Sequence, residues 1–515
     1  LKRLYGHDCE TILPQSRILS VPVRIDAIQR SSQSDARTAM ADFASVMQKV
    51  DKPGPGLGPE HSHPSPDPQA TILQQDDLRL YKARWIILVV YMLYSMANAV
   101  HWIQYSIISN IMVKFYGVSN FAIDTTSTIY MIVYVPLVVP ASWILDRLGL
   151  KVTMVMGAAG TCLGAWIKVL SAEPGRFLTT LLGQGLVACS QAFILSLPSR
   201  LAAVWFGSTE VSTACSLGVF GNQLGAALGF LIPPMIVHDS DNLDDIGNDL
   251  WKMFISFAIL NTAIFFLVIW IIQAEPQIAP SNAQVVQRKK RDDPEILQDV
   301  FMSSVKELLK NNGYILLLIS YGINVGAFFA ISTLLNQFIL LYFPGHEEDV
   351  GRIGLTLVLC GLGGSIICGY ILDKTHLYKE TTLMVYGSTL ISMLIYTFSL
   401  SHGQSIWIIY ITASLLGLFM TGYLPVGYEL AIELTYPIPE GTSSGLLNGG
   451  TQLIGFILTS IYSWVFSTMG DLAANMMIVG LLTFGFLLTI FIPTDLKRQA
   501  AHKAIEDKQK LGFGL

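Results

Sequence analysis

The chain has 515 residues, of which 52% are hydrophobic and 13% are charged, and its formal net charge is −5. Soluble proteins carry about 25% charged residues, so the composition argues against a soluble enzyme, and the negative charge argues against a nucleic-acid partner. Residues 1–83 hold 20 of the charged residues, residues 274–310 hold 12 and residues 495–515 hold 8. This distribution indicates a polytopic membrane protein with three polar segments.

Residues 1–80 are predicted to form a disordered cytosolic tail. They contain no signal-peptide core, and the stretch DKPGPGLGPEHSHPSPDP at 51–68 is too rich in proline and glycine to fold. His61 and His63 in this stretch are read as part of a solvated tract rather than a metal site. The six cysteines have no disulfide or metal-ligand spacing, so we expect neither a metal nor a cofactor.

From Arg84 onward, twelve apolar stretches are long enough to span about 30 Å of hydrocarbon. They are 84–113, 122–145, 151–171, 177–204, 210–236, 250–273, 313–342, 350–372, 380–400, 405–430, 441–467 and 473–493. We therefore predict an all-α fold with an N-terminal six-helix bundle at 81–273 and a C-terminal six-helix bundle at 313–494. A cytosolic linker at 274–312 joins them, and a cytosolic tail follows at 495–515.

The basic residues predict the orientation. With the N-terminus inside, the cytosolic segments collect most of the lysines and arginines, including the run at 288–291, whereas acidic residues cluster in the external loops at 239–249 and 347–349. Both termini are therefore expected to lie in the cytosol.

The two halves share an internal repeat. Ile144-Leu145-Asp146-Arg147 recurs as Ile371-Leu372-Asp373-Lys374 and Leu197-Pro198 recurs as Leu424-Pro425, both 227 residues later. Gln223-Leu224 recurs as Gln452-Leu453 and Glu210 matches Glu440, at offsets of 229 and 230. Two parallel six-helix repeats resemble the architecture of the major facilitator superfamily, in which a central pathway runs between the halves.

Aromatic and polar residues follow one predicted face of the first span. Asn98, Trp102, Tyr105 and Ser109 are spaced as on a single helix, and the offset of 227 carries Trp102 onto Phe329. The aromatics could belong to a membrane-interface belt or to helix packing, but Trp102 lies well inside its span. We therefore predict that Trp102 and Phe329 line a central pocket.

Other polar residues lie deep in candidate cavity helices, where they line the pathway or bond helices together. Those assigned to the cavity are Tyr130, Gln191, Asn222, Gln223, Asn448 and Gln452. Gln191 and Gln452 are favoured as substrate ligands because small residues and prolines lie near them.

Acidic and basic side chains are rare in the middle of the cavity helices. Arg200 lies at the cytosolic end of the fourth span, with Glu429 and Glu433 at the matching end of the tenth, and we interpret them as a cytosolic gate rather than a proton relay. An uncharged aromatic cavity suits a small cation whose charge is spread over methyl groups, because aromatic faces attract quaternary ammonium ions.

Longer motifs resemble the feline leukaemia virus subgroup C receptor family between Tyr81 and Lys503. They are NAVHWIQYSIISN at 98–110, FYGV at 115–118, LGAWIK at 163–168, LPSR at 197–200, VWFGSTEVSTAC at 204–215, GNQLG at 221–225, STLLNQ at 332–337 and MTGYLP at 420–425. The sequence looks like an invertebrate member.

The resemblance implies a plasma-membrane carrier of choline and ethanolamine, with an internal membrane as the alternative location and a monomer as the transport unit. It implies that the cation lies against Trp102 and Phe329 with Tyr130 nearby, and that Gln191 and Gln452 lie near the choline hydroxyl. The family has Tyr at the position of Phe329 and Gln at the position of His101, so this chain lacks one hydroxyl of that pocket.

Two other functions remain open from the sequence. A haem exporter would need axial ligands and basic groups for the propionates, and His101 is the one histidine within a span. A non-transporting receptor or sensor would use the N-terminal tail. No nucleophile–base pair or metal-ligand spacing indicates an enzyme.

Overall fold

A computed structural model describes residues 79–493, except 208–209, 281–283, 285–302, 376, 403–404, 437 and 439, together with Lys497. The predicted disordered tail up to residue 78, most of the predicted linker and nearly all of the predicted C-terminal tail lie outside these residues. The described residues are almost entirely helical and contain no strand.

The N-terminal half is built from helices that all belong to the first six spans. They are α2 (Ala83–Ile103), the short 3₁₀ helix η2 (Ser106–Ile108), α3 (Ser109–Tyr116), α4 (Asn120–Val169), α5 (Phe177–Leu195), α6 (Leu197–Trp205), α7 (Val211–Ile236) and α8 (Leu243–Ile271). α4 contains two spans, which Gly149 separates with a positive φ of 81° that favours glycine.

The C-terminal half has one long helix for each of its spans. They are α11 (Asn312–Tyr342), α12 (Glu347–Thr375), α13 (Tyr378–His402), α14 (Ile406–Thr435), α15 (Glu440–Met469) and α16 (Asp471–Ile490). Together, the described residues contain twelve helices long and apolar enough to cross a membrane. The predicted all-α fold with twelve spans is confirmed.

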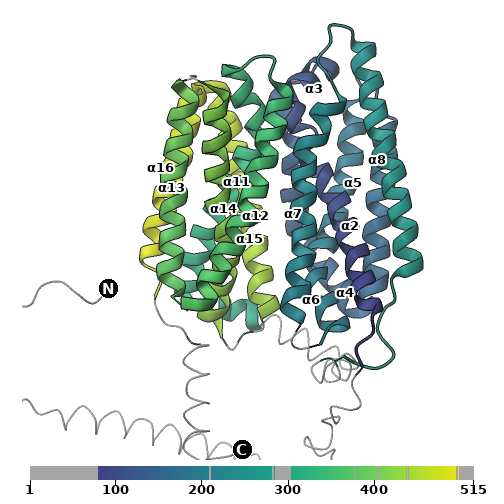
Figure 1. Ribbon diagram of the computed structural model, residues 1–515, viewed down its shortest axis with the longest axis vertical. Helices are drawn as coiled ribbons and strands as arrows, with labels where there is room; N and C mark the ends of the chain where they lie inside the picture. Colours follow the sequence, from purple (N-terminus) through teal and green to yellow (C-terminus); the bar gives the residue numbers. More distant parts are fainter. Residues whose placement is uncertain are drawn as a thin grey trace, which may run out of the picture. The chain divides into compact units, whose positions relative to one another are not determined.

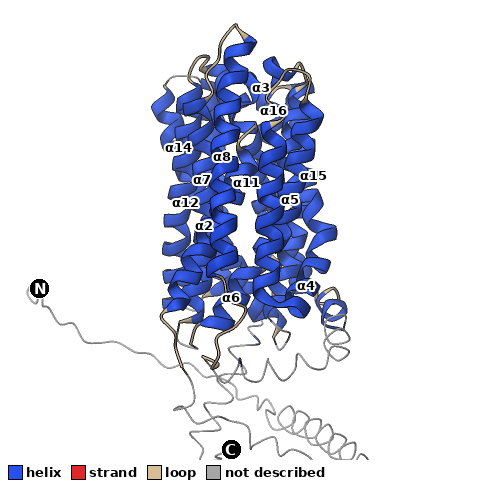
Figure 2. Ribbon diagram, turned by 90° about the vertical axis from the view of Figure 1, so that its right-hand side faces the viewer, coloured by secondary structure: helices blue, strands red, loops and turns tan. Residues whose placement is uncertain are grey.

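The helix axes of both halves are nearly parallel to one another, and the N-terminal helices lie beside the C-terminal ones (Figures 1 and 2). α3 and α6 lie at opposite ends of the N-terminal helices, and these ends are called the α3 end and the α6 end below. The first and last residues of the bundle lie at the α6 end, near Leu80 and Pro493, because each half contains an even number of spans.

The first span is broken in the middle of its length. α2 ends at Ile103, and Gln104 and Tyr105 lead into η2 and α3. Two side chains from other helices bond the carbonyl oxygens at the end of α2: Gln184 Nε2 donates to the His101 oxygen at 2.7 Å and Ser127 Oγ donates to the Trp102 oxygen at 3.0 Å. These bonds replace some of the backbone bonds that end with the helix.

The two halves differ in local structure at one pair of positions that the repeat matches. The fourth span also breaks, at Ser196, and Pro198 lies in the first turn of α6, where a missing N–H costs little. Its repeat counterpart Pro425 lies inside the continuous helix α14. The matched Leu-Pro pairs therefore occupy equivalent spans with different local structure.

Glycines allow the helices within each half to pack closely. On α7, Gly221, Gly225 and Gly229 recur every four residues and face α2, where a Cβ atom at Gly229 would lie 2.8 Å from the Val100 carbonyl oxygen. A Cβ atom at Gly225 would overlap the Met96 carbonyl oxygen. Small residues at four-residue spacing are the usual contact surface between membrane helices, so this face holds α2 against α7.

The substitution Gly225→Ala is expected to destabilise the protein by about 1–3 kcal/mol, because the added methyl group forces α2 and α7 apart. The measurement is the thermal unfolding of the purified protein in detergent. Gly363→Ala is the control, because nothing lies within 4 Å of a Cβ atom there, and it should be neutral or slightly stabilising. Equal melting temperatures for the two variants would contradict the close contact.

Candidate functional site

The two halves meet through aromatic rings near the middle of the first and seventh spans. The rings of Trp102 on α2 and Phe329 on α11 have their centroids 5.5 Å apart and meet edge to face at 74°. Trp102 is 8% exposed. Trp102 and Phe329, which were predicted to line a central pocket, are thus in direct ring contact, and their role in lining a pocket stays a prediction.

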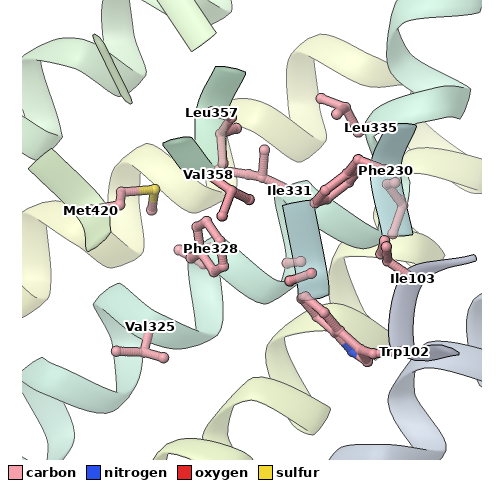
Figure 3. Close-up of a cluster of buried hydrophobic side chains, with 14 of the residues drawn as sticks. Trp102, Ile103, Phe230, Val325, Phe328, Ile331, Leu335, Leu357, Val358 and Met420 are labelled. Atoms are coloured by element: carbon pink, nitrogen blue, oxygen red, sulfur yellow. The ribbon is translucent and has the colours of Figure 1, made fainter. Parts of the chain in front are cut away.

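Trp102 lies at one edge of a cluster of buried apolar side chains from both halves (Figure 3), and Phe329 packs against this cluster. Among those labelled there are Ile103 of α2, Phe230 of α7, Val325, Phe328, Ile331 and Leu335 of α11, Leu357 and Val358 of α12, and Met420 of α14. The ring pair thus lies in a largely apolar environment, which strengthens any electrostatic interaction with the ring faces.

The ring contact lies on the axis that relates the two repeats. Trp102 and Phe329 are 227 residues apart, and so are Ser109 and Asn336, whose Oγ and Oδ1 atoms lie 2.9 Å apart in a hydrogen bond. Two residues related by an internal two-fold axis contact each other only where they lie close to that axis. The central line between the halves therefore runs along α2, α3 and α11.

Two predicted site residues carry polar atoms with unused hydrogen-bonding capacity. Within the described part of the chain, Tyr130 Oη and Gln191 Oε1 are buried and have no hydrogen-bond partner. Gln191 lies on α5 between Val187 and Ile194, whose carbonyl oxygens accept bonds from Asn98 and Tyr91 of α2. Because buried polar groups are normally satisfied, these two atoms are candidate partners for a polar ligand or a water molecule.

One face of α15 brings predicted residues to the same region. Asn448 donates to Tyr134 Oη of α4 at 3.0 Å, across the two halves. Gln452 lies one turn further along and is 6% exposed. One turn beyond it, a Cβ atom at Gly455 would lie 2.8 Å from the Phe329 ring. Along α15, Gln452 therefore lies between Asn448, which contacts the N-terminal half, and Gly455, which contacts the Phe329 ring.

The predicted continuous helical face of the first span is wrong, because α2 ends at Ile103 and Ser109 belongs to α3. Asn98 is buried and donates to Thr161 Oγ1 and to the Val187 carbonyl oxygen, within the N-terminal half. Tyr105 is fully buried, and its ring packs against Phe254 of α8. Its side chain thus contacts the interior of the N-terminal half.

The remaining predicted residues lie further along the helices. Asn222 of α7 is half-buried and donates to Ser95 Oγ of α2 at 3.3 Å, and Gln223 is half-buried beside it. Arg200, Glu429 and Glu433 lie toward the α6 end; Glu433 is 2% exposed, and all three interact with other groups. Their pairing as a gate stays a prediction.

A polar network joins the halves at the α3 end, and Asn336 of α11 is its centre. Its Oδ1 accepts from Ser109 Oγ at 2.9 Å and from the Asn110 backbone N–H at 3.4 Å. Its Nδ2 donates to the Ile107 carbonyl oxygen at 2.8 Å and to Asn110 Oδ1 at 3.1 Å. The segment after the break in the first span is thereby bound to the C-terminal half.

A buried carboxylate adds a second connection at the α3 end. Asp124 of α4 is 2% exposed, and its two oxygens accept from Gln337 Nε2 at 2.7 Å and from Ser463 Oγ at 2.6 Å. Both donors belong to the C-terminal half. The acid therefore holds α4 to α11 and α15 through hydrogen bonds rather than an ion pair.

Sequence reasoning missed Asp124 and also missed the burial of Lys168, which is 1% exposed at the end of α4. Both lie near the ends of their predicted spans, 122–145 and 151–171, where a charged side chain usually reaches water. The signal for Asp124 is an acidic residue among the first residues of an otherwise apolar span.

Comparison with known proteins gives concordant results. The sequence profile of the Major Facilitator Superfamily matches residues 87–460. The choline/ethanolamine transporter flvcr2a of Danio rerio is 47% identical over 443 residues, which cover 86% of this chain and 93% of that protein. The choline/ethanolamine transporter FLVCR2 of Homo sapiens is 45% identical over 432 residues, which cover 84% of this chain and 81% of that protein.

A solved structure shares the fold at much lower sequence similarity. The inward-facing, occupied structure of a bacterial homologue of the human lysosomal transporter Spinster superposes with a TM-score of 0.62 at 11% identity, over 80% of this chain and 97% of that one. At this identity the likeness concerns the fold alone.

The substitution Asp124→Leu is expected to destabilise the folded protein by about 1–3 kcal/mol for each donor left unpaired, because Gln337 and Ser463 lose their acceptor. Asp124→Asn is the matched control, since its amide can still accept from Gln337 and donate to a rotated Ser463 hydroxyl. Thermal unfolding should rank the wild type and Asp124→Asn above Asp124→Leu. A leucine variant as stable as the asparagine variant would refute the role of the carboxylate.

Proposed function

The chain belongs to the major facilitator superfamily, within the feline leukaemia virus subgroup C receptor family of transporters, and from this premise we propose that it is a facilitative uniporter of choline and ethanolamine. This family consists of transporters rather than enzymes. The proposed carrier works by alternating access in the plasma membrane, with both termini in the cytosol.

The observation that carries this proposal is the contact between Trp102 and Phe329 at the axis of the repeat. In the proposal the edge-to-face contact opens when the substrate enters, so that both rings turn their faces to a quaternary ammonium group, and each attracts it electrostatically by about 2 kcal/mol when water is excluded. A cation held between rings of both halves also links substrate binding to the approach of the halves.

The proposal assigns the other end of the substrate to buried polar side chains. Choline carries a hydroxyl group two carbons from its ammonium, and ethanolamine carries a hydroxyl and a primary ammonium. Gln191 Oε1 and Tyr130 Oη have no partner among the described residues, and Gln452 lies one turn from the contact of Gly455 with Phe329. In the proposal, Gln191 and Gln452 bind the hydroxyl and Tyr130 lies beside the cation.

The conformation supports an alternating-access cycle. The Asn336 and Asp124 bonds join the halves at the α3 end, which the proposal takes to be the external end because basic residues are predicted to collect on the cytosolic side. In the proposed cycle these bonds hold the external side closed, and they separate when the cation enters from outside. The second group of predicted gate residues, Arg200, Glu429 and Glu433, acts at the cytosolic side.

The site does not support the alternative hypothesis that the protein is a haem exporter. His101 is 1% exposed, and its two ring nitrogens lie 3.1 Å from Gln104 Oε1 and 3.1 Å from Asn261 Nδ2. An axial haem ligand needs a free nitrogen facing the pathway. A receptor without transport activity would not need ring contacts at the axis between its halves.

The substitution Trp102→Ala is expected to raise the half-saturating choline concentration by on the order of thirtyfold, which corresponds to about 2 kcal/mol of lost cation–π attraction. Trp102→Phe should keep part of the affinity because it keeps a ring face. The measurement is radiolabelled choline uptake in cells that lack other choline carriers, with surface expression quantified. Trp270→Ala, at a tryptophan that is 79% exposed, is the control and should transport normally.

Unchanged uptake in Trp102→Ala would refute the site, whereas absent uptake by the wild type at the surface would refute the choline proposal.

A uniporter of a monovalent cation should accumulate it in proportion to the membrane potential. At about 2.3 kcal/mol per charge per 100 mV, a potential of about 60 mV supports roughly tenfold accumulation. Depolarisation with potassium should abolish accumulation, and an imposed pH gradient should leave the steady-state level unchanged. Accumulation driven by a pH gradient at zero potential would show proton-coupled transport instead.

A further inference from the structure

A lysine is enclosed inside the N-terminal half. Lys168 lies in the last turn of α4 and is 1% exposed. A Cβ atom at Gly183 of α5 would lie 2.8 Å from the Lys168 stem, so this glycine makes room for it. Among the described residues Lys168 takes part in no ion pair.

The amine of Lys168 faces the ring of His101. Its Nζ lies 3.2 Å from His101 Nδ1 and 5.4 Å from the centroid of the Tyr105 ring. His101 is itself 1% exposed and packs against the Phe257 ring of α8, with centroids 5.3 Å apart. Two titratable groups from different helices therefore touch each other away from water.

The orientation of Asn261 determines which nitrogen of His101 carries its proton. Asn261 Nδ2 donates to the Phe257 carbonyl oxygen at 2.8 Å, and the reversed amide would place two oxygens against each other. The same Nδ2 lies 3.1 Å from His101 Nε2. Because the amide nitrogen of Asn261 can only donate, His101 Nε2 must accept the hydrogen bond. The proton of the neutral His101 ring is therefore on Nδ1.

This proton position has a consequence for Lys168. With a hydrogen on His101 Nδ1, an ammonium group at 3.2 Å would point a donor at a donor, whereas an uncharged amine accepts the hydrogen in its lone pair. Gln104 Oε1, at 3.1 Å from the same Nδ1, is a second acceptor for that hydrogen. Even so, the 3.2 Å contact between Lys168 Nζ and His101 Nδ1 is a hydrogen bond only when Lys168 is uncharged.

Burial acts in the same direction. A buried ammonium without a carboxylate partner costs several kcal/mol. The other titratable groups that the described residues place at this cluster are phenols: Tyr105 beside the amine, with Tyr116 of α3 and Tyr130 of α4 interacting with Tyr105. None of them supplies a negative charge at neutral pH.

The pair is connected to the candidate site through the chain itself. His101 directly precedes Trp102, and Gln104 begins the break that ends α2. Gln184 holds the His101 carbonyl oxygen and Ser127 holds that of Trp102. A proton added at Lys168 would set a donor against the hydrogen on His101 Nδ1, so it would disturb the segment that positions Trp102.

We propose that Lys168 and His101 form a proton-binding site inside the N-terminal half, which is unprotonated at Lys168 in this conformation and shifts the Trp102 segment to another conformation when it binds a proton. The site changes the rate of the conformational cycle, while the membrane potential sets the direction of transport. The inference does not depend on the identity of the transported cation.

The first test measures protons without any substrate. If Lys168 is uncharged in the fold and charged in the unfolded chain, unfolding takes up one proton and stability rises with pH, by at most tenfold in the unfolding equilibrium per pH unit. Thermal unfolding of the full-length protein is measured from pH 6 to pH 8.5 for the wild type, Lys168→Met and Lys168→Arg.

The expected result is a rise of melting temperature with pH in the wild type that is clearly reduced in Lys168→Met. Lys252→Met is the matched control, because Lys252 is exposed and pairs with Asp249, and it should keep the wild-type slope. An unchanged slope in Lys168→Met would overturn the proposal. If the methionine variant fails to fold, Lys168→Arg, whose side chain is always charged, replaces it in the test. A melting temperature of the arginine variant equal to that of the wild type at pH 8.5 would also overturn the proposal.

The second test measures the initial rate of choline uptake at equal internal and external pH. The wild-type rate is expected to fall on acidification, by up to tenfold per pH unit, and the rate of Lys168→Met is expected to be less sensitive to pH. A wild-type rate that is independent of pH would overturn the link to transport. If choline is not transported at all, the proposed function fails, and the unfolding test still decides the proton site.

Discussion

Contact between equivalent residues of the two repeats is the constraint on which the rest of this structure depends. Trp102 meets Phe329 and Ser109 meets Asn336, each pair at a separation of 227 residues. These contacts place the two-fold axis of the repeat between two sets of helices. α2 and α3 lie on one side of the axis, and α11 lies on the other. Glycine faces such as Gly221, Gly225 and Gly229 hold helices together within a half, so movement is directed to the seam between the halves.

The break in the first span separates two kinds of contact between the halves, a ring contact and a polar network. α2 presents Trp102 to Phe329, and α3 presents Ser109 and Asn110 to Asn336. Side chains from α4 and α5 hold the carbonyl oxygens at the end of α2. Irregular backbone is tolerated inside a membrane protein where neighbouring side chains satisfy it, and here it allows the ring contact and the polar network to be placed independently on one span.

Much of the fold could be predicted because bilayer thickness acts on every span in the same way. The twelve predicted stretches match the observed helices, and the family resemblance of the motifs is confirmed. The repeat offset led to the Trp102–Phe329 pairing, because symmetry turns a sequence distance into a spatial relation. The break after Ile103 was not predictable, since HWIQYSII contains neither glycine nor proline. The burial of Asp124 and Lys168 depends on contacts with other helices, and hydropathy alone does not reveal such contacts.

The concentration of four bonds on the single amide of Asn336 has a consequence for how the α3 end opens. A side-chain amide occupies discrete rotamers, so the four bonds form together and are lost together. In an alternating-access cycle, loss of the Asn336 bonds would then be one cooperative step, separate from loss of the Asp124 bonds to Gln337 and Ser463. Single molecules observed over time would show the Asn336 step as an abrupt transition.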